Sequence, residues 1–387
     1  MVINNFLPFI GGAEVQAHKL SKQLLRNGHT VNVLTSKWSG DHLPSSDTIE
    51  NVKVYRVPCP FIKIGRKQIG QSFFTFCQFL YVLGKCASNY DIIHVHQALR
   101  PALAAAIAGK MFSRPTLCKI GNSGNLFDLR RYKKVYIEGQ LGVKGIIKYI
   151  DAFVSISTKI THTLADFVKK EKIVSIPNGV DLVHPTFSKE SRLGGKTRVI
   201  SIGSLTNKKN FDLMIDAIGT LETNVKENIE VKILGDGPER EALQHQITKL
   251  NLDGTISLLG NVSDIGNHLQ NSDLFMLVSK AEGMSNALLE ALSFGLPVIC
   301  SDVGNNAELV GISSEPEADD ADIHAGRCGL IIGSVTQETI REGLEAFLAL
   351  SQQAKVEMGG NASSSVKTFS IQNVALEYEK LYEYLRK

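Results

Sequence analysis

Residues 199–234 have the sequence VISIGSLTNKKNFDLMIDAIGTLETNVKENIEVKIL. The apolar run at 199–202 is typical of a short buried strand, and the run at 231–234 repeats it. Between them, residues 211–221 carry apolar side chains at helical spacing, which predicts a helix. A strand, a helix and a second strand in this order predict two parallel strands joined by a right-handed crossover.

The same alternation continues along the rest of the chain. In the second half, the pattern predicts strands at 256–259, 274–278 and 298–300, and helices at 239–250 and 287–294. In the first half, it predicts strands at 30–35, 52–57, 91–95, 116–120 and 153–156, and a helix at 13–26 that stops before Gly28. We therefore expect an α/β fold with two doubly wound, Rossmann-like domains that face each other across a cleft.

A chain of 387 residues is long enough for two such domains. We expect an N-terminal domain at 1–187 and a C-terminal domain at 196–370, with the helix at 371–387 packed back on the first. The polar stretch 188–196 is the expected linker. The acidic stretch 313–325 is expected to form a surface insertion.

Composition narrows the class of protein. Hydrophobic residues make up 43% and charged residues 21%, which indicates a soluble globular protein and excludes disordered, collagen-like and coiled-coil classes.

No apolar run is long enough to span a membrane, and the start lacks the pattern of a signal peptide. The first apolar stretch, 2–6, is short for a central strand and suggests a shortened start. Six cysteines without a C-x-x-C pair indicate reduced thiols and a cytoplasmic protein.

The net charge of +3 conceals an asymmetry. Residues 1–190 contain 25 Lys and Arg against 12 Asp and Glu, a net charge of +13, whereas the remainder carries −10. The basic half combines an aromatic stretch at 73–81 with a set of cations: Lys63, Arg66, Lys67, Arg130, Arg131, Lys133, Lys134, Lys144 and Lys148. This combination suits an anionic membrane surface, and with it a lipid diphosphate. The alternative is an ordinary core helix beside a solvated face, and no motif indicates nucleic-acid binding.

The loops that follow predicted strands carry the polar residues expected of a site. After strand 274–278, Ser285 or Asn286 can cap a helix whose N–H groups face an anion, and Glu290 one turn inside can accept hydrogen bonds from paired hydroxyls, as in ribose recognition. After strand 199–202, Lys208 and Lys209 can neutralise a diphosphate. The alternatives are a capping arrangement with solvated glutamates and a pair of surface lysines.

Five short motifs occur in order along the chain: Gly11-Gly12-Ala13-Glu14, Ile176-Pro177-Asn178-Gly179-Val180-Asp181, a G-x-L-x-x-x-K pattern ending at Lys209, Gly235-Asp236-Gly237-Pro238-Glu239-Arg240, and two glutamates eight apart, Glu282 and Glu290. None of them is the G-x-G-x-x-G dinucleotide fingerprint. Together they resemble the retaining, nucleotide-sugar-dependent glycosyltransferases of the GT-B type, family four (group 1). The resemblance covers nearly the whole chain.

The resemblance implies that the domain at 1–187 binds the acceptor and that the domain at 196–370 binds the nucleotide sugar. It also implies a role for each matching residue. Lys209, with Lys208 and Gly12, would stabilise the leaving diphosphate, Glu282 would contact the transferred sugar, and Glu290 would bind the ribose. The remaining donor contacts would come from Val262 at the base and from the backbone of Met284, Ser285, Asn286, Ala287 and Leu288 at the sugar and phosphate. A UDP-sugar is the favoured donor, and no metal is expected.

The sequence departs from the family pattern at two positions. Ser204 stands where the family carries an arginine, so that Lys208 is the candidate substitute, although an ammonium does not reproduce a bidentate guanidinium. The histidine usual after strand 116–120 is absent, and Lys119 and Asn122 occupy that region. His96 is a candidate base or acceptor contact, but burial in the core is the favoured interpretation of His94 and His96.

The expected activity is transfer of a hexose-type sugar, with retention, to a glycan or lipid-linked acceptor in polysaccharide or glycolipid biosynthesis. The alternatives are a nucleotide-sugar epimerase or a phosphorylase on the same architecture, and a non-catalytic binding subunit. The expected location is the cytoplasm. Peripheral attachment to the cytoplasmic face of the membrane is a further expectation. A D-x-D motif at 320–322 matches metal-dependent transferases of another fold, and we interpret it as solvated.

Overall fold

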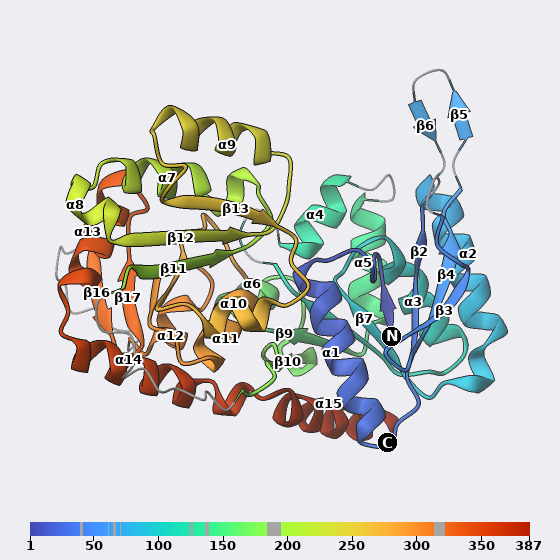
Figure 1. Cartoon of the computed structure of the whole chain (residues 1–387). Coiled ribbons are helices and arrows are strands. Elements are labelled where there is room, and N and C mark those ends of the chain that lie inside the picture. Colours follow the sequence, from blue (N-terminus) through green and yellow to red (C-terminus); the bar gives the residue numbers. More distant parts are fainter. Residues whose placement is uncertain are drawn as a thin grey trace. The chain divides into compact units, whose positions relative to one another are not determined.

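The fold is described from a computed structural model of the chain. The structure describes residues 1–38, 42–60, 62–64, 67–69, 71–122, 124, 127–135, 139–183, 195–312 and 322–387. They form two compact units, the first comprising Met1–Gly179 with Ile371–Lys387 and the second comprising Val180–Ser370 (Figure 1). Most of the expected linker at 188–196 and of the acidic stretch at 313–325 lies outside the described residues.

The first unit is built on an eight-stranded sheet in the order β10–β9–β8–β7–β1–β2–β4–β3, in which all neighbours are parallel except β3 and β4. Its strands are β1 (Val2–Ile3), β2 (Asn32–Lys37), β3 (Ser46–Ile49), β4 (Val52–Pro58), β7 (Ile93–His96), β8 (Thr116–Ile120), β9 (Ala152–Ser155) and β10 (Ile173–Ser175). A separate hairpin consists of β5 (Ile62–Ile64) and β6 (Lys67–Ile69).

Two groups of helices pack within the first unit. The helices are α1 (Gly12–Arg26), α2 (Gln71–Lys85), α3 (Arg100–Met111), α4 (Asp128–Val135), α5 (Gly139–Tyr149), α6 (Thr158–Ala165) and α15 (Ile371–Arg386). Helices α2, α3, α5 and α4 are neighbours in that order, and α15 lies beside α1 (Figure 1). Leu20 of α1 and Tyr378 of α15 share a buried cluster with Leu117 of β8, so the last helix completes the core of the first unit.

The second unit contains a seven-stranded sheet in the order β13–β12–β11–β14–β15–β17–β16, parallel except for β16. Its strands are β11 (Thr197–Ile202), β12 (Ile229–Leu234), β13 (Ile256–Gly260), β14 (Leu274–Leu277), β15 (Val298–Ser301), β16 (Ile323–Gly326) and β17 (Gly329–Ile332). Its helices are α7 (Phe211–Gly219), α8 (Thr223–Glu227), α9 (Arg240–Lys249), α10 (Ile265–Gln270), α11 (Asn286–Ser293), α12 (Asn306–Val310), α13 (Gln337–Ala349) and α14 (Gln352–Ser365).

The two doubly wound α/β sheets predicted from the sequence are confirmed, and every predicted strand has its counterpart in the sheets. The first unit ends at Gly179, earlier than the expected residue 187. The cause is local, because Val180 bridges to Ser370 and its N–H donates to the carbonyl of Phe369 at 2.9 Å. These contacts join residue 180 to the second unit.

Candidate active site

Three loops of the second unit leave the carboxyl ends of β11, β14 and β15, which are neighbours in the sheet. Because these strands are parallel, the loops at 203–210, 278–285 and 302–306 emerge at the same edge. This edge carries the two lysines and the glutamate that the sequence singled out. The structure brings them into direct contact.

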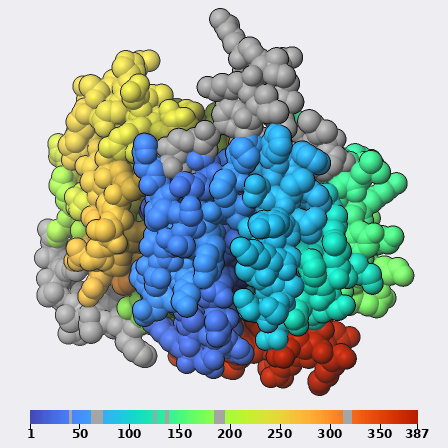
Figure 2. Space-filling model, turned by 90° about the vertical axis from the view of Figure 1, so that its right-hand side faces the viewer, coloured from blue at the N-terminus to red at the C-terminus, as the bar shows by residue number. Residues whose placement is uncertain are grey.

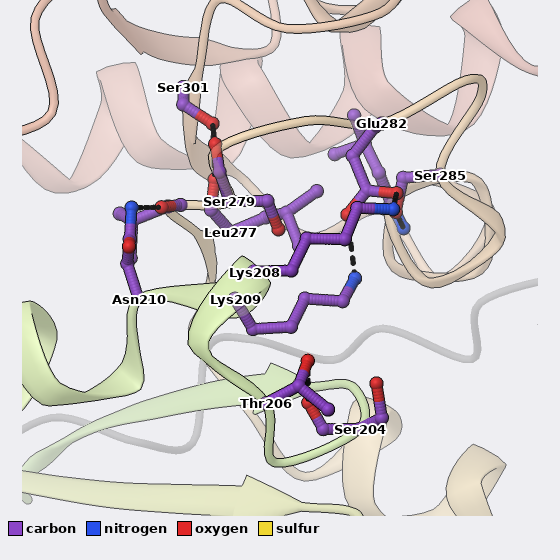
Figure 3. Close-up of polar contacts among 12 residues, drawn as sticks. Ser204, Thr206, Lys208, Lys209, Asn210, Leu277, Ser279, Glu282, Ser285 and Ser301 are labelled. Atoms are coloured by element: carbon purple, nitrogen blue, oxygen red, sulfur yellow. Dashed lines mark hydrogen bonds and ion pairs between the residues drawn. The ribbon is translucent and has the colours of Figure 1, made fainter. Parts of the chain in front are cut away.

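An ion pair lies at the centre of this edge. Lys209 Nζ donates to Glu282 Oε1 at 2.6 Å, and Lys208 Nζ lies 4.0 Å from Glu282 Oε2. Figure 3 shows both lysine side chains directed at this carboxylate. The Glu282 side chain is only 10% exposed. Burial alone would raise its pKa, but the charges of Lys209 and Lys208, together with hydrogen bonds from Lys209 and Ser279, outweigh burial and hold the pKa below its ordinary value, so the carboxylate is ionised.

Lys208 is half-buried beside this carboxylate. Burial lowers the pKa of Lys208, and the charge of Lys209 adds to that effect against the attraction of Glu282. Two cations thus face one carboxylate, which leaves an excess of positive charge for a bound anion. The arrangement suits a diphosphate whose charge increases as it departs.

Two glycines allow the lysine loop to pack closely. A Cβ at Gly203 would lie 2.9 Å from Cε of Lys209, so the lysine side chain lies over this residue. At Gly235, where φ is +130°, a Cβ would lie 2.0 Å from the carbonyl oxygen of Gly203. The loops after β11 and β12 therefore approach each other through backbone atoms, and this contact holds Lys209 in place.

Helix α11 begins where the sequence analysis expects it. Ser285 is the N-cap, and its hydroxyl accepts a hydrogen bond from Leu288 N at 3.3 Å. The first turn of α11 consists of Asn286, Ala287 and Leu288 and follows the buried residue Met284. Glu290 lies one turn further on and is half-buried. The Glu282 loop and the start of α11 therefore form one continuous segment of the site.

The loop after β15 packs against the backbone of Glu282 and Gly283. Gly304 has a φ of +64°, and a Cβ there would lie 2.6 Å from the carbonyl oxygen of Gly283.

We expect Gly304→Ala to lower the free energy of unfolding by about 1–3 kcal/mol through backbone strain and this clash. Thermal unfolding measures the loss. Gly254→Ala is the control, because a Cβ there meets nothing within 4 Å. Equal melting temperatures in the two variants would contradict the packing argument.

Three other predicted donor residues are not part of the ion pair. Ser204 is exposed and follows β11 in the same loop as the lysines. Val262 is half-buried and follows β13, two strands away from β11 and therefore about 10 Å along the sheet. An extended nucleotide can span that separation. Gly12 begins α1 in the first unit.

The predicted acceptor residues His96 and Lys119 are paired across β7 and β8 in the first unit. They are only 2% and 6% exposed. The ring of His94 stacks on His96 at 4.3 Å, and Nδ1 of His94 lies 2.8 Å from the hydroxyl of Tyr382 in α15. Burial lowers the pKa of Lys119 to about 7 and holds the pKa of both histidines well below the ordinary value. These side chains lie in the core beneath α15, the interpretation that the sequence favoured for the histidines.

Asn122, the third predicted acceptor residue, is bound to a residue that the sequence analysis missed. Its Nδ2 donates to Asp128 Oδ1 at 2.8 Å, and the N–H of Gly121 donates to Asp128 Oδ2 at 3.2 Å. Asp128 is fully buried, and this burial raises its pKa to about 6. A single acid at the start of the basic stretch 128–134 was the signal available in the sequence.

Within the described ranges, no three His, Cys, Asp or Glu side chains gather as a metal site requires. Of the D-x-D motif at 320–322, only Asp322 lies among the described residues.

Models of two glycosyltransferase families match the two halves of the chain. Residues 10–184 match the family model described as Glycosyltransferase Family 4, and residues 184–363 match Glycosyl transferases group 1. A 2-deoxystreptamine N-acetyl-D-glucosaminyltransferase of Niallia circulans is 26% identical over 325 residues, which cover 78% of this chain and 82% of that protein. A UDP-Gal:alpha-D-GlcNAc-diphosphoundecaprenol alpha-1,3-galactosyltransferase of Escherichia coli is 31% identical over 252 residues, which cover 60% of this chain and 62% of that protein.

Solved structures show the same fold. HepE of Anabaena, crystallised in complex with UDP and glucose, has a TM-score of 0.75 at 17% identity, with 99% of this chain and 98% of that chain covered. At this identity the likeness concerns the fold alone. It confirms the GT-B fold expected from the sequence.

Proposed function

This chain belongs to the family 4 (group 1) glycosyltransferases, and from that premise we propose that it transfers a sugar from a UDP-sugar to a glycan or lipid-diphosphate acceptor, with retention. Membership makes it a transferase enzyme that acts in glycan or glycolipid biosynthesis. The observation that carries the proposal is the convergence of Lys209 and Lys208 on Glu282 at the carboxyl edge of the second sheet.

In the proposed reaction, the donor's diphosphate lies against Lys208 and Lys209. Bound phosphate competes with Glu282 for Lys209, which releases the carboxylate to accept hydrogen bonds from the sugar hydroxyls. The bond from the anomeric carbon to the diphosphate breaks, and a bond to the acceptor oxygen forms on the same face. The acceptor proton passes to a departing phosphate oxygen, while the lysines stabilise the charge of the leaving group.

One relative and one structural neighbour support the choice of substrates. The Anabaena structure contains UDP and glucose, and the name of the Escherichia coli relative specifies UDP-galactose and a diphosphoundecaprenol acceptor. In this chain the lysines supply positive charge at the proposed diphosphate position. We therefore propose that transfer proceeds without a divalent cation.

Calorimetric titration with UDP-, GDP- and ADP-sugars in the presence of EDTA tests the donor assignment. The expected result is binding of a UDP-sugar, followed by release of UDP that depends on an added acceptor. Release of free nucleotide without any acceptor would instead favour the epimerase alternative. Failure to bind any nucleotide sugar would refute the proposal.

We also propose that the first unit binds the surface of an anionic membrane through the layer formed by α2, α3, α5 and α4. Helix α2 buries Phe79 in the core but leaves Phe73 and Tyr81 65% and 64% exposed. The helix therefore has a buried face, as a core helix does, and an exposed aromatic face that supports the membrane proposal. Figure 2 shows the light-blue segment that includes α2 at the surface. In the described part of the chain, no helix has the length and apolar character that a membrane span requires.

Helix α4 supplies the charge of this layer. It buries Leu129 and Tyr132 completely and exposes four cations: Arg130, Arg131, Lys133 and Lys134. Cations near an anionic bilayer contribute about 1 kcal/mol each. This charge lies in the same layer as the exposed aromatic residues of α2.

Reversing the charge of Lys133 and Lys134 to glutamate is expected to lower the affinity for anionic liposomes by at least about 10-fold. Co-sedimentation measures the affinity, which should also fall with salt. Lys196→Glu with Lys249→Glu, two exposed lysines of the second unit, is the matched control. Equal binding to neutral liposomes would argue against the membrane proposal.

A further inference from the structure

Asn210 connects the turn that carries the lysines to helix α7. It follows Lys209 directly, occupies the N-cap position of α7 and is only 1% exposed. Its backbone is left-handed, with φ at +52° and ψ at +36°. Residues other than glycine seldom adopt this conformation, and asparagine is among the few that do so readily.

The side chain of Asn210 extends to the neighbouring strand. Its Nδ2 donates to the carbonyl oxygen of Val278 at 2.9 Å, a bond drawn in Figure 3. Val278 directly follows β14 and opens the loop that carries Glu282. The amide therefore joins the lysine loop to the glutamate loop from within the core.

Two further contacts run along the same pair of loops. The N–H of Lys280 donates to the carbonyl of Lys208 at 2.8 Å, and Nζ of Lys280 bonds Oδ1 of Asn207. The Lys280 side chain is exposed, whereas the Asn210 amide is buried. Of the two side-chain contacts, the amide of Asn210 is therefore the one that water competes with less.

We propose that Asn210 is a positioning residue, which fixes the distance and direction of Lys209 relative to Glu282 by tethering its own backbone to Val278. This inference rests on the proposed function, which places the Lys209–Glu282 pair at the donor. A residue at this position needs two properties: it must adopt the left-handed backbone conformation, and its side chain must donate a hydrogen bond to the carbonyl of Val278. Glycine has only the first, aspartate supplies no amide donor for the second, and asparagine has both.

The variant Asn210→Gly separates the two properties, because it keeps the backbone conformation and removes the tether. We expect turnover to fall about 10- to 100-fold, since a misplacement of roughly 1 Å can cost as much as 10²-fold. The UDP affinity should change less than about three-fold, because the other donor contacts remain in place. Asn251→Gly is the matched control, since Asn251 is also left-handed, with a φ of +56°, but ends α9 away from the site.

A double-mutant cycle with Lys209→Ala distinguishes positioning from a general structural role. If Asn210 acts through Lys209, Asn210→Gly should lower turnover in the wild-type background and change it less than about two-fold in the Lys209→Ala background. Equal losses in the two backgrounds would overturn the inference, as would wild-type turnover in Asn210→Gly.

Asn210→Asp provides a second test if the glycine variant does not fold. It keeps the size of the side chain and a tolerance for the left-handed backbone, but presents an oxygen to the carbonyl of Val278. The same dependence on Lys209 is expected, and turnover equal to wild type would contradict the tether. If wild-type protein binds no nucleotide sugar, the proposed function fails; if wild-type protein is active and both variants match it, only this inference fails.

Discussion

Lys209→Ala is expected to lower turnover by about 10²- to 10³-fold, the loss typical of removing one preorganised donor that stabilises developing charge. Lys209 Nζ is bonded to Glu282 at 2.6 Å and lies over Gly203, so it is held in place before the donor arrives. The diphosphate gains negative charge as the glycosidic bond breaks. The lysine therefore interacts more strongly with the transition state than with the bound donor, and turnover falls more than donor affinity.

Initial rates at saturating donor measure this loss. Lys280→Ala is the matched control, because Lys280 is exposed in the same pair of loops but bonds Asn207 instead of Glu282. It should leave turnover within about three-fold of wild type, since surface interactions contribute little. If Lys280→Ala costs as much as Lys209→Ala, general disruption of the loops explains both, and Lys209 has no special role.

Glu290→Ala is expected to weaken UDP binding by about 10- to 150-fold, because a hydrogen bond to a charged group is worth roughly 1.5–3 kcal/mol. Glu290 lies one turn inside α11, whose first turn begins at the Ser285 cap. In the proposed complex, its carboxylate accepts hydrogen bonds from both ribose hydroxyls. This interaction exists before and after transfer, so affinity falls more than turnover.

Calorimetry with UDP and with 2′-deoxy-UDP tests the ribose contact. The loss caused by Glu290→Ala should be smaller for the deoxynucleotide, which lacks one of the two hydroxyls. Glu241→Ala, an exposed glutamate in the first turn of α9, is the control and should bind both nucleotides as wild type does. An equal loss for both nucleotides in Glu290→Ala would show that the residue does not read the ribose.

Sequence patterns predicted the sheets well because buried parallel strands are continuous apolar runs. β15 and β14 are buried along their whole length and appear as such in the sequence. The edge strand β3, with the sequence Ser-Asp-Thr-Ile, is mostly exposed and polar, so no apolar pattern revealed it. Its existence depends on pairing with β4, which local sequence does not encode.

The same distinction holds at the site. Lys209 and Glu282 are 73 positions apart, yet both follow neighbouring parallel strands, and this rule placed them together. The role of Asn210 depends on a dihedral angle and on a carbonyl that another loop presents, and neither leaves a mark in the sequence. The burial of His96 was the interpretation that the sequence favoured, whereas the burial of Lys119 depends on how Tyr378 of α15 packs against it, a tertiary contact that periodicity cannot supply.

Acceptor-dependent release of UDP tests the central claim most directly. Wild-type and Lys209→Ala protein are compared at saturating UDP-sugar, in EDTA, with and without a lipid-diphosphate acceptor. The account predicts release by wild type only when the acceptor is present, and release at least about 10²-fold slower in Lys209→Ala. No release by wild type with any donor and acceptor pair, or equal rates in the two proteins, would contradict it.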